Sequence, residues 1–91
     1  MTIKVYVPAM LRARCGVEPE LSFDAPDLRH LLTEIERLHP ELHRGICHET
    51  GAVRQHINLF VNTLNSRDCE GLDTRLTNGD VVTILPAVSG G

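Results

Sequence analysis

The chain has 91 residues, a length that supports one domain with a single hydrophobic core. Charged residues make up 23% of the sequence and the formal net charge is −3, which disfavours binding to nucleic acid or to an acidic membrane surface. The three cysteines are an odd number without any Cys-x-x-Cys spacing, which argues against a disulfide framework and against a zinc knuckle.

The apolar runs of the sequence are no longer than strands, and residues 1–4 do not begin like a signal peptide. We therefore expect a cytoplasmic protein that does not enter the membrane. Reduced, structural thiols are the expected state of Cys15, Cys47 and Cys69. Cys15, beside Arg14, is the best candidate among them for a reactive thiol that relays sulfur.

The N-terminal part of the sequence predicts an antiparallel strand pair. Residues 3–7 alternate between apolar and polar side chains, as a half-buried strand does, and Pro8 ends this pattern. After a turn at residues 14–17, the segment 18–23 places Leu21 and Phe23 on one side, which suits a returning strand.

A helix is predicted next, over residues 28–38, with Asp27 as its N-cap. Its apolar positions recur at intervals of three and four: Leu28, Leu31, Leu32, Ile35 and Leu38. The helix is expected to end near His39, because Pro40 cannot donate a backbone hydrogen bond. Residues 41–56 show no sustained period and are predicted to form a loop.

The second half of the chain predicts a core strand at 57–62, a short edge strand or turn at 64–70, and a last strand at 81–85. Leu72 and Leu76 are expected to hold a helical turn beneath the sheet, and residues 78–80 form a turn. One crossing helix lets the first and last strands pair in parallel. The predicted fold is therefore α+β of the β-grasp (ubiquitin-like) class, with four to five mixed strands packed on one main helix.

A short tail, residues 86–91, is expected to follow a folded domain of residues 1–85. Its six residues are Pro86, Ala87, Val88, Ser89, Gly90 and Gly91. Six extended residues reach on the order of 20 Å, and the two glycines, which lack Cβ, pass a channel no wider than a backbone. The tail therefore suits threading into another protein's active site, although a frayed chain end is the simpler reading of the dipeptide alone.

A carboxylate must be activated before it can react, and this chain has no Gly-rich phosphate loop with which to bind ATP. Adenylation of Gly91 would therefore use ATP held by a separate enzyme, and the chain itself would bind no cofactor stably. Attack on the adenylate by a persulfide or sulfide would give a thiocarboxylate. Attack by an amine would instead give an isopeptide bond.

The C-terminal stretch, residues 78–91, resembles the G-D-x-V-x-x-x-P-x-V-x-G-G ending of the ubiquitin-like sulfur carriers. That family includes the thiamine-pathway carrier and the small subunit of molybdopterin synthase. Residues 82–88 and 57–62 are most similar to the branch that serves cysteine biosynthesis, and weaker similarity extends over residues 5–8 and the helix. The resemblance covers essentially the whole chain.

The resemblance implies that Gly91 is adenylated and thiocarboxylated, with Gly90 as its narrow neighbour, and that the protein is a carrier rather than an enzyme. It also implies three partners: an adenylating enzyme of the ubiquitin-activating type, a sulfurtransferase or other sulfur donor, and an acceptor such as a cysteine-synthase-like protein. Some relatives carry residues after the glycines that a protease removes, so the sequence leaves open whether Gly91 is exposed by trimming.

A docking patch is predicted from strand alternation. Alternation along residues 57–62 points Phe60 to solvent, and alternation along residues 81–85 places Thr83 and Leu85 on the same open face near the tail. Because exposed apolar clusters mark interfaces, Phe60 and Leu85 are the candidate docking residues. The alternative is that the loop 41–56 covers Phe60.

One group of side chains recurs at intervals near four, which on a continuous helix would align metal ligands: His39, His43, Cys47 and His48. Pro40 and Gly45 argue against such a helix, so we expect solvated loop residues and no metal site.

Three functions remain open from the sequence. Sulfur transfer leads, with cysteine or a related metabolite favoured over molybdopterin and thiamine. A protein modifier that attaches Gly91 to lysines needs the same activation, so the sequence does not separate the two. A plain interaction module with an inert tail is the third.

Overall fold

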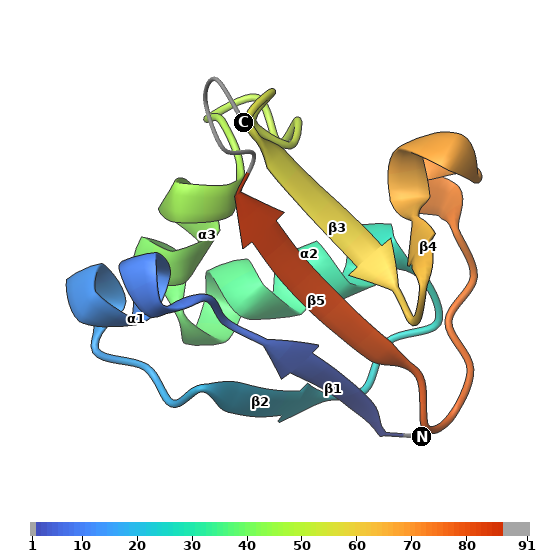
Figure 1. Cartoon of the computed structure of the whole chain (residues 1–91), viewed down its shortest axis with the longest axis horizontal. Coiled ribbons are helices and arrows are strands. Elements are labelled where there is room, and N and C mark those ends of the chain that lie inside the picture. The colour runs from blue at the N-terminus through green and yellow to red at the C-terminus, as the bar shows by residue number, and fades with distance from the viewer. Residues whose placement is uncertain (1, 87–91) are drawn as a thin grey trace.

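The first and last strands of the chain lie side by side at the centre of a mixed sheet (Figure 1). The computed structural model describes residues 2–86. Within that range the sheet has five strands in the order β2-β1-β5-β3-β4, with β1 and β5 parallel and the other pairs antiparallel. Their bounds are β1 Ile3–Tyr6, β2 Glu20–Phe23, β3 Ile57–Val61, β4 Leu64–Asn65 and β5 Val81–Pro86.

Helices cover one face of this sheet (Figure 1). Alternate strand side chains point into that layer, so Ile3 and Val5 of β1 are buried while Lys4 and Tyr6 are exposed. The longest helix, α2 (Leu28–Leu38), buries the apolar stripe that its periodicity predicts: Leu28, Leu31, Leu32 and Ile35. The β-grasp architecture predicted from the sequence is confirmed.

Asp27 begins α2 as the sequence predicts. Its carboxylate accepts a hydrogen bond of 2.8 Å from the backbone N–H of His30, which satisfies one free donor of the first turn. That hydrogen bond holds the pKa of Asp27 below its ordinary value. The helix ends at Leu38, one residue before His39, as expected.

Two short helices correct the sequence-based prediction. Residues 9–15 form α1 (Ala9–Cys15), which stops at Gly16 in the left-handed conformation, whereas only a turn at residues 14–17 was predicted. A helix of seven residues that buries Leu11 has too few turns to show a period. Its signals are the Gly16 C-cap and the helix-forming residues before it.

The segment 41–56, predicted as a loop, begins instead with α3 (Pro40–Ile46). Pro40 does end α2, but it also occupies the first turn of α3, where its missing N–H has no helical partner to lose. Leu42 and Ile46 of α3 are buried in the core, and Gly45 lies within the helix. The sequence-based prediction treated Pro40 and Gly45 only as residues that end a helix. It missed that Pro40 can begin a helix and that Gly45 can lie inside one.

The last part of the chain largely follows the prediction. A two-residue turn that contains Asn62 at φ 56° joins β3 to β4, and two 3-10 turns, η1 (Ser66–Asp68) and η2 (Gly71–Asp73), lead back beneath the sheet. Leu76 is buried there and Leu72 packs against the core. Strand β5 extends through Pro86, one residue beyond the predicted end of the folded domain. Among the helices of residues 2–86, none has the length and apolar character needed to cross a bilayer.

Candidate functional site

The sheet face turned away from the helices carries a row of side chains centred on β5. Thr83 of β5 lies opposite Tyr6 of β1 on one side and opposite Phe60 of β3 on the other. Opposed residues point to the same face, so these three side chains lie together. Tyr6 is 42% exposed, and Phe60 and Thr83 are half-buried.

Leu85 extends this row toward the end of β5. It lies opposite Asn58 and is 43% exposed. We call Tyr6, Asn58, Phe60, Thr83 and Leu85 the open face. The two predicted docking residues, Phe60 and Leu85, are therefore on the same side of neighbouring strands.

The segment 41–56 packs on the opposite side of the sheet from Phe60. Leu42, Ile46 and Cys47 are buried in the same core cluster as Ile57 and Leu59, and Val53 packs against that cluster. Because Ile57 and Leu59 alternate with Phe60, the ring of Phe60 points away from this segment. The alternative in which these residues cover Phe60 does not fit this packing.

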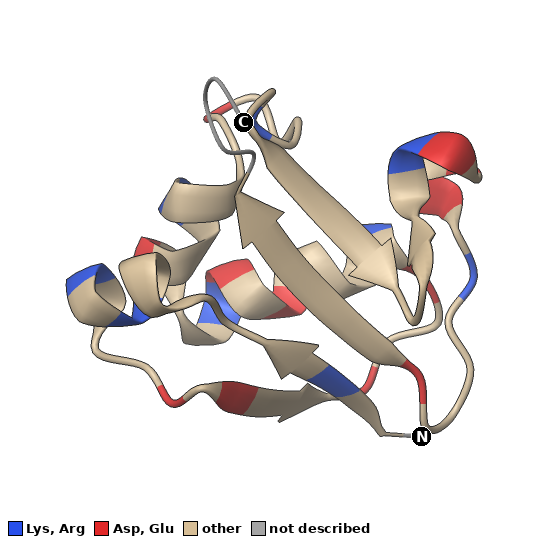
Figure 2. Ribbon diagram, in the orientation of Figure 1, with Lys and Arg blue, Asp and Glu red and all other residues tan. Residues whose placement is uncertain are grey.

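The open face carries little charge. Strands β3 and β5 contain only uncharged residues, and Figure 2 shows both as a neutral band across the sheet. On the flanking strands, Lys4 and Glu20 approach each other at 3.8 Å, so their charges offset one another. Asn65 donates a 3.3 Å hydrogen bond to Asn58, which engages one amide of this face. A neutral, part-apolar face suits contact with another protein.

The predicted carrier residues follow directly from this face. Pro86 is the last residue of β5 and lies opposite Ile57. The remaining predicted tail residues, Ala87, Val88, Ser89, Gly90 and Gly91, lie outside the described residues. Their departure point is nonetheless fixed, because β5 is the middle strand of the sheet.

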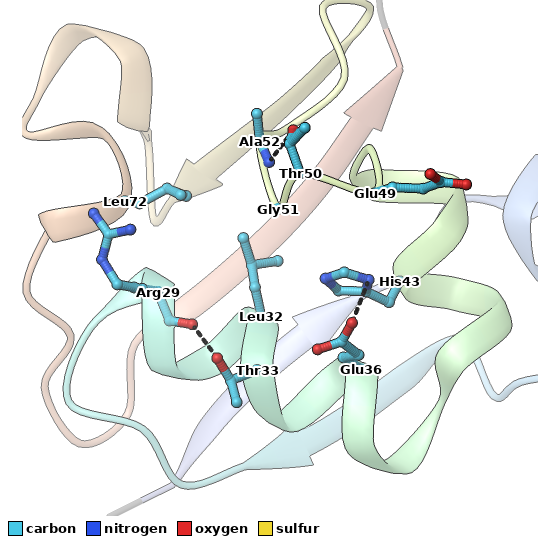
Figure 3. A pocket seen from close by; sticks show the side chains of 10 residues that line it. All are labelled: Arg29, Leu32, Thr33, Glu36, His43, Glu49, Thr50, Gly51, Ala52 and Leu72. Atoms are coloured by element: carbon cyan, nitrogen blue, oxygen red, sulfur yellow. Dashed lines mark hydrogen bonds and ion pairs between the residues drawn. The ribbon is translucent and has the colours of Figure 1, made fainter.

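A hollow of about 540 Å³ is on the helical side of the molecule (Figure 3). It lies between α2, residues 49–52 and Leu72. Its polar side chains mostly satisfy one another or the backbone: His43 Nδ1 is 3.7 Å from Glu36, and the Thr33 hydroxyl donates to the carbonyl of Arg29. No paired nucleophile and base converge among these lining residues, so the hollow does not have the geometry of an active site.

The cysteines do not form a reactive centre. All three are free thiols, with Cys47 buried, Cys15 half-buried and Cys69 exposed. Burial is the main cause that raises the pKa of Cys47 to about 11, and burial also raises the pKa of Cys15. Both thiols therefore stay protonated at neutral pH, which makes Cys15 a poor relay for sulfur.

The histidines considered as metal ligands are spread over different surroundings. The ring of His39 packs edge-on against Phe23 at 6.2 Å, while His43 faces Glu36 and lies within α3. Pro40 and Gly45 were expected to prevent a helix in this segment, and this prediction was wrong, since α3 contains both residues. Within residues 2–86, no three His, Cys, Asp or Glu side chains come close enough together to hold a metal ion.

Tyr6 is the open-face residue that the sequence analysis did not single out. Alternation along β1 turns its side chain outward, but neither alternation nor the predicted pairing of the first and last strands gives the register between them. Only the parallel register with β5 brings Tyr6 next to Thr83.

Known proteins of one family are similar to this chain over nearly its full length. The profile of the ThiS family matches residues 5–91. The sulfur carrier protein CysO of Mycobacterium tuberculosis is 30% identical over 93 residues, an alignment that covers 100% of both chains.

Solved structures agree with this match. The CysO chain of an Amycolatopsis orientalis BexX/CysO complex superposes with a TM-score of 0.85 at 29% identity, covering 98% of this chain and 99% of that one. The small archaeal modifier protein 1 of Methanosarcina acetivorans gives a TM-score of 0.85 at 32% identity, with 99% and 96% covered. The chain therefore belongs to the ThiS family and is a ubiquitin-like sulfur carrier protein of the CysO type.

Proposed function

We propose that a partner enzyme adenylates the carboxylate of Gly91 and that a sulfur donor then converts it to a thiocarboxylate. The carboxylate oxygen attacks the α-phosphate of ATP and pyrophosphate leaves. Sulfide then attacks the acyl carbon and AMP leaves, which places sulfur on the carrier. If a persulfide delivers the sulfur, a thiol reductant cleaves the resulting acyl disulfide. ATP stays with the partner enzyme, and the carrier is a substrate in each step.

The observation that carries this proposal is a diglycine that follows the central strand of a β-grasp domain after three residues. A strand held on both sides by β1 and β3 gives residues 87–91 a fixed root, while two glycines let the far end enter a narrow channel. The neutral open face around that root offers a docking surface. Gly91 is thus the reactive residue and Gly90 its slender neighbour.

We place the sulfur in the biosynthesis of cysteine or a related metabolite in the cytoplasm. Support comes from the similarity of residues 57–62 and 82–88 to the cysteine branch of carriers, and from full-length identity to a sulfur carrier named CysO. The solved BexX/CysO complex is an example of a related carrier with a protein partner. An adenylating enzyme, a sulfur donor and an acceptor enzyme are the partners proposed here.

Intact mass spectrometry of the protein purified from its native cells tests the central step. We expect a fraction of the protein in which one oxygen of the terminal carboxylate is replaced by sulfur. A variant that lacks Gly91 is the control and should show no such species. If wild-type protein from sulfur-starved and sulfur-fed cells carries only oxygen at this position, the thiocarboxylate proposal is wrong.

Phe60→Asp tests the docking role of the open face. A charge at the centre of this neutral surface should slow adenylation by roughly tenfold or more, as loss of an interface anchor does. ATP–pyrophosphate exchange with the purified activating enzyme measures the effect. Leu38→Asp is the control, because it also replaces an apolar side chain with a charge, but at an exposed position at the end of α2, away from the open face. If Phe60→Asp and wild type had equal rates of ATP–pyrophosphate exchange and equal melting temperatures, the open face would not be the docking surface.

A protein modifier is the second candidate, favoured by the 32% identity to small archaeal modifier protein 1. In that case a lysine amine attacks the adenylated or thioester-linked Gly91 and forms an isopeptide bond. Arg75 is the last trypsin site of the chain, so trypsin would leave residues 76–91 as a branch on the modified lysine. Peptides that carry this branch, lost in cells that lack Gly91, would identify this use.

A further inference from the structure

A small pocket of about 210 Å³ is lined mainly by cationic groups from three separate segments. Arg14 comes from α1, Arg44 with Gly45 from α3, and Arg54 with His56 from the residues just before β3. Among the described residues, no acidic side chain lines it. We call this the arginine pocket. Its positive lining contrasts with the net charge of −3 of the whole chain.

Arg44 and Arg54 are held in place by hydrogen bonds or ion pairs, and the positive charge of the pocket is only partly neutralised. Arg54 is half-buried, and its Nε donates a 2.9 Å hydrogen bond to the carbonyl oxygen of Arg44. Arg44 pairs with Glu41 at 2.6 Å. Within residues 2–86, neither Arg14 nor Arg54 has a carboxylate within ion-pair distance, in contrast to Arg29, which pairs with Asp73 at 2.9 Å.

Like charges gathered in one hollow repel each other unless an anion joins them. Among residues 2–86, no carboxylate pairs with the guanidinium group of Arg14 or of Arg54, and each offers planar N–H donors that match the two oxygens of a carboxylate. Because a backbone carbonyl fixes the Nε of Arg54, its terminal nitrogens are free to face a ligand. The pocket therefore has the chemistry of an oxyanion site.

The pocket also lies at the end of the sheet where β5 finishes. Pro86 is opposite Ile57, the residue that follows His56 in the chain. Figure 2 shows basic positions on α1 and in the loop before β3 at this end of the molecule. A protein that accepts residues 87–91 must cover this end. The five residues after Pro86 span about 17 Å when extended, so the pocket meets the surface around the channel and not the reacting group.

We propose that the arginine pocket binds carboxylate side chains on the partner protein, at the rim of the opening that takes in the diglycine. The inference rests on the proposed function, because only a threaded tail brings a partner against this end. The open face supplies apolar contact, and the pocket supplies attraction of opposite charges that orients the carrier during approach. Charge pairs at the edge of an interface mainly raise the association rate and make it depend on salt.

A fluorescein-labelled octaglutamate peptide serves as the probe for binding by fluorescence anisotropy and by amide NMR shifts. Arg14→Gln combined with Arg54→Gln should weaken the peptide about tenfold, the loss expected for charge-assisted hydrogen bonds. The largest shifts should fall at residues 14, 44, 45, 54 and 56. Arg29→Gln combined with Arg75→Gln removes the same charge away from the pocket and should weaken the peptide much less.

Three results would overturn the inference. If both double variants weakened octaglutamate binding equally, the attraction would come from the general charge of the protein and not from the pocket. If an octaserine peptide bound with equal affinity, binding would not depend on the negative charge of the peptide. If inorganic pyrophosphate bound at the same residues more tightly than octaglutamate at the same ionic strength, the pocket would be a phosphate site and not a site for an acidic protein surface.

This test is independent of loading. Octaglutamate binding requires neither ATP nor Gly91, so a protein that binds the peptide at the arginine pocket but never carries sulfur would contradict only the proposed function. A protein that carries sulfur in cells but binds octaglutamate no better than octaserine would contradict only the acidic-partner inference.

Discussion

Asp27 shows how one side chain couples a helix to pH. Its carboxylate accepts the backbone N–H of His30 at 2.8 Å, and this hydrogen bond favours the ionised form. The pKa of Asp27 is therefore lower in the folded protein than in the unfolded chain. Its contribution to stability is fully present above the unfolded pKa, near 4, and is lost as the pH falls through the folded pKa. Asp80 follows the same rule, because the backbone N–H of Thr77 lowers its pKa.

Asp27→Ala should lower the free energy of unfolding by about 1 kcal/mol at neutral pH, the usual cost of losing an N-cap. Asp27→Asn keeps a capping oxygen without the charge, so it should retain most of the stability at pH 7 and lose less stability on acidification. Urea unfolding followed by circular dichroism from pH 7 to pH 2 measures both. An unchanged acid dependence in Asp27→Asn would contradict the assignment.

Elements pack closely where α1 meets α3. A Cβ placed on Gly45 would lie 2.7 Å from Cδ2 of Leu11, a side chain that is 2% exposed. The two helices therefore approach through a glycine on one and a leucine on the other. This contact also explains why a residue with poor helix propensity lies inside α3.

Gly45→Ala should destabilise the protein by about 1–3 kcal/mol, because the enclosed Leu11 has little room to move. The higher helix propensity of alanine alone would raise the free energy of unfolding by about 1 kcal/mol. The sign of the measured change therefore shows whether the contact with Leu11 or helix propensity dominates. Thermal and urea unfolding measure it. Combining Gly45→Ala with Leu11→Val should recover part of the loss relative to the sum of the single changes, which would show that the contact is the cause.

The sequence predicted the elements that carry a long period or a strong end signal. α2 has five apolar positions and an Asp cap, and the alternation of β1, β3 and β5 assigns their inner faces. α1 and α3 were missed because each has seven residues and buries only one or two apolar side chains. Tertiary packing, as between Leu11 and Gly45, stabilises these two helices, and such packing cannot be predicted from the local periodicity of the sequence.

The candidate site divides in the same way. Alternation placed Phe60 and Leu85 on one face, which the structure confirms, whereas the chemistry at Gly91 stays a prediction from the residue types. The predicted pairing of the first and last strands did not include their register, so only the structure brings Tyr6 beside Thr83 on the open face. The arginine pocket was not predicted either, because it joins Arg14, Arg44 and Arg54, which come from segments without any shared motif.

At the scale of the whole molecule, the sheet is organised around β5. This strand pairs with β1 on one side and β3 on the other, so it joins the two halves of the chain. Val82 and Ile84 also place their side chains in the core. Residues 1–79 alone would retain two separate strand pairs with no strand between them.

A fragment of residues 1–79 should therefore be unfolded, whereas a fragment of residues 1–86 should have nearly the stability of the full chain. Far-UV circular dichroism and the dispersion of amide NMR signals compare the two. Loss of more than about 1 kcal/mol in the 1–86 fragment would show that residues 87–91 take part in the fold. A folded 1–79 fragment would contradict the central role of β5.

The pairing of β1 with β5 has a consequence for biosynthesis. A ribosome makes β1 before β5, so the sheet has no centre until residues 81–86 have been made. Until β5 has been made, β1 of the nascent chain lacks its parallel neighbour. A product that terminates before β5 thus lacks the middle strand of the sheet. Under the proposed function it also lacks Gly91 and would not compete with full-length carriers for activation.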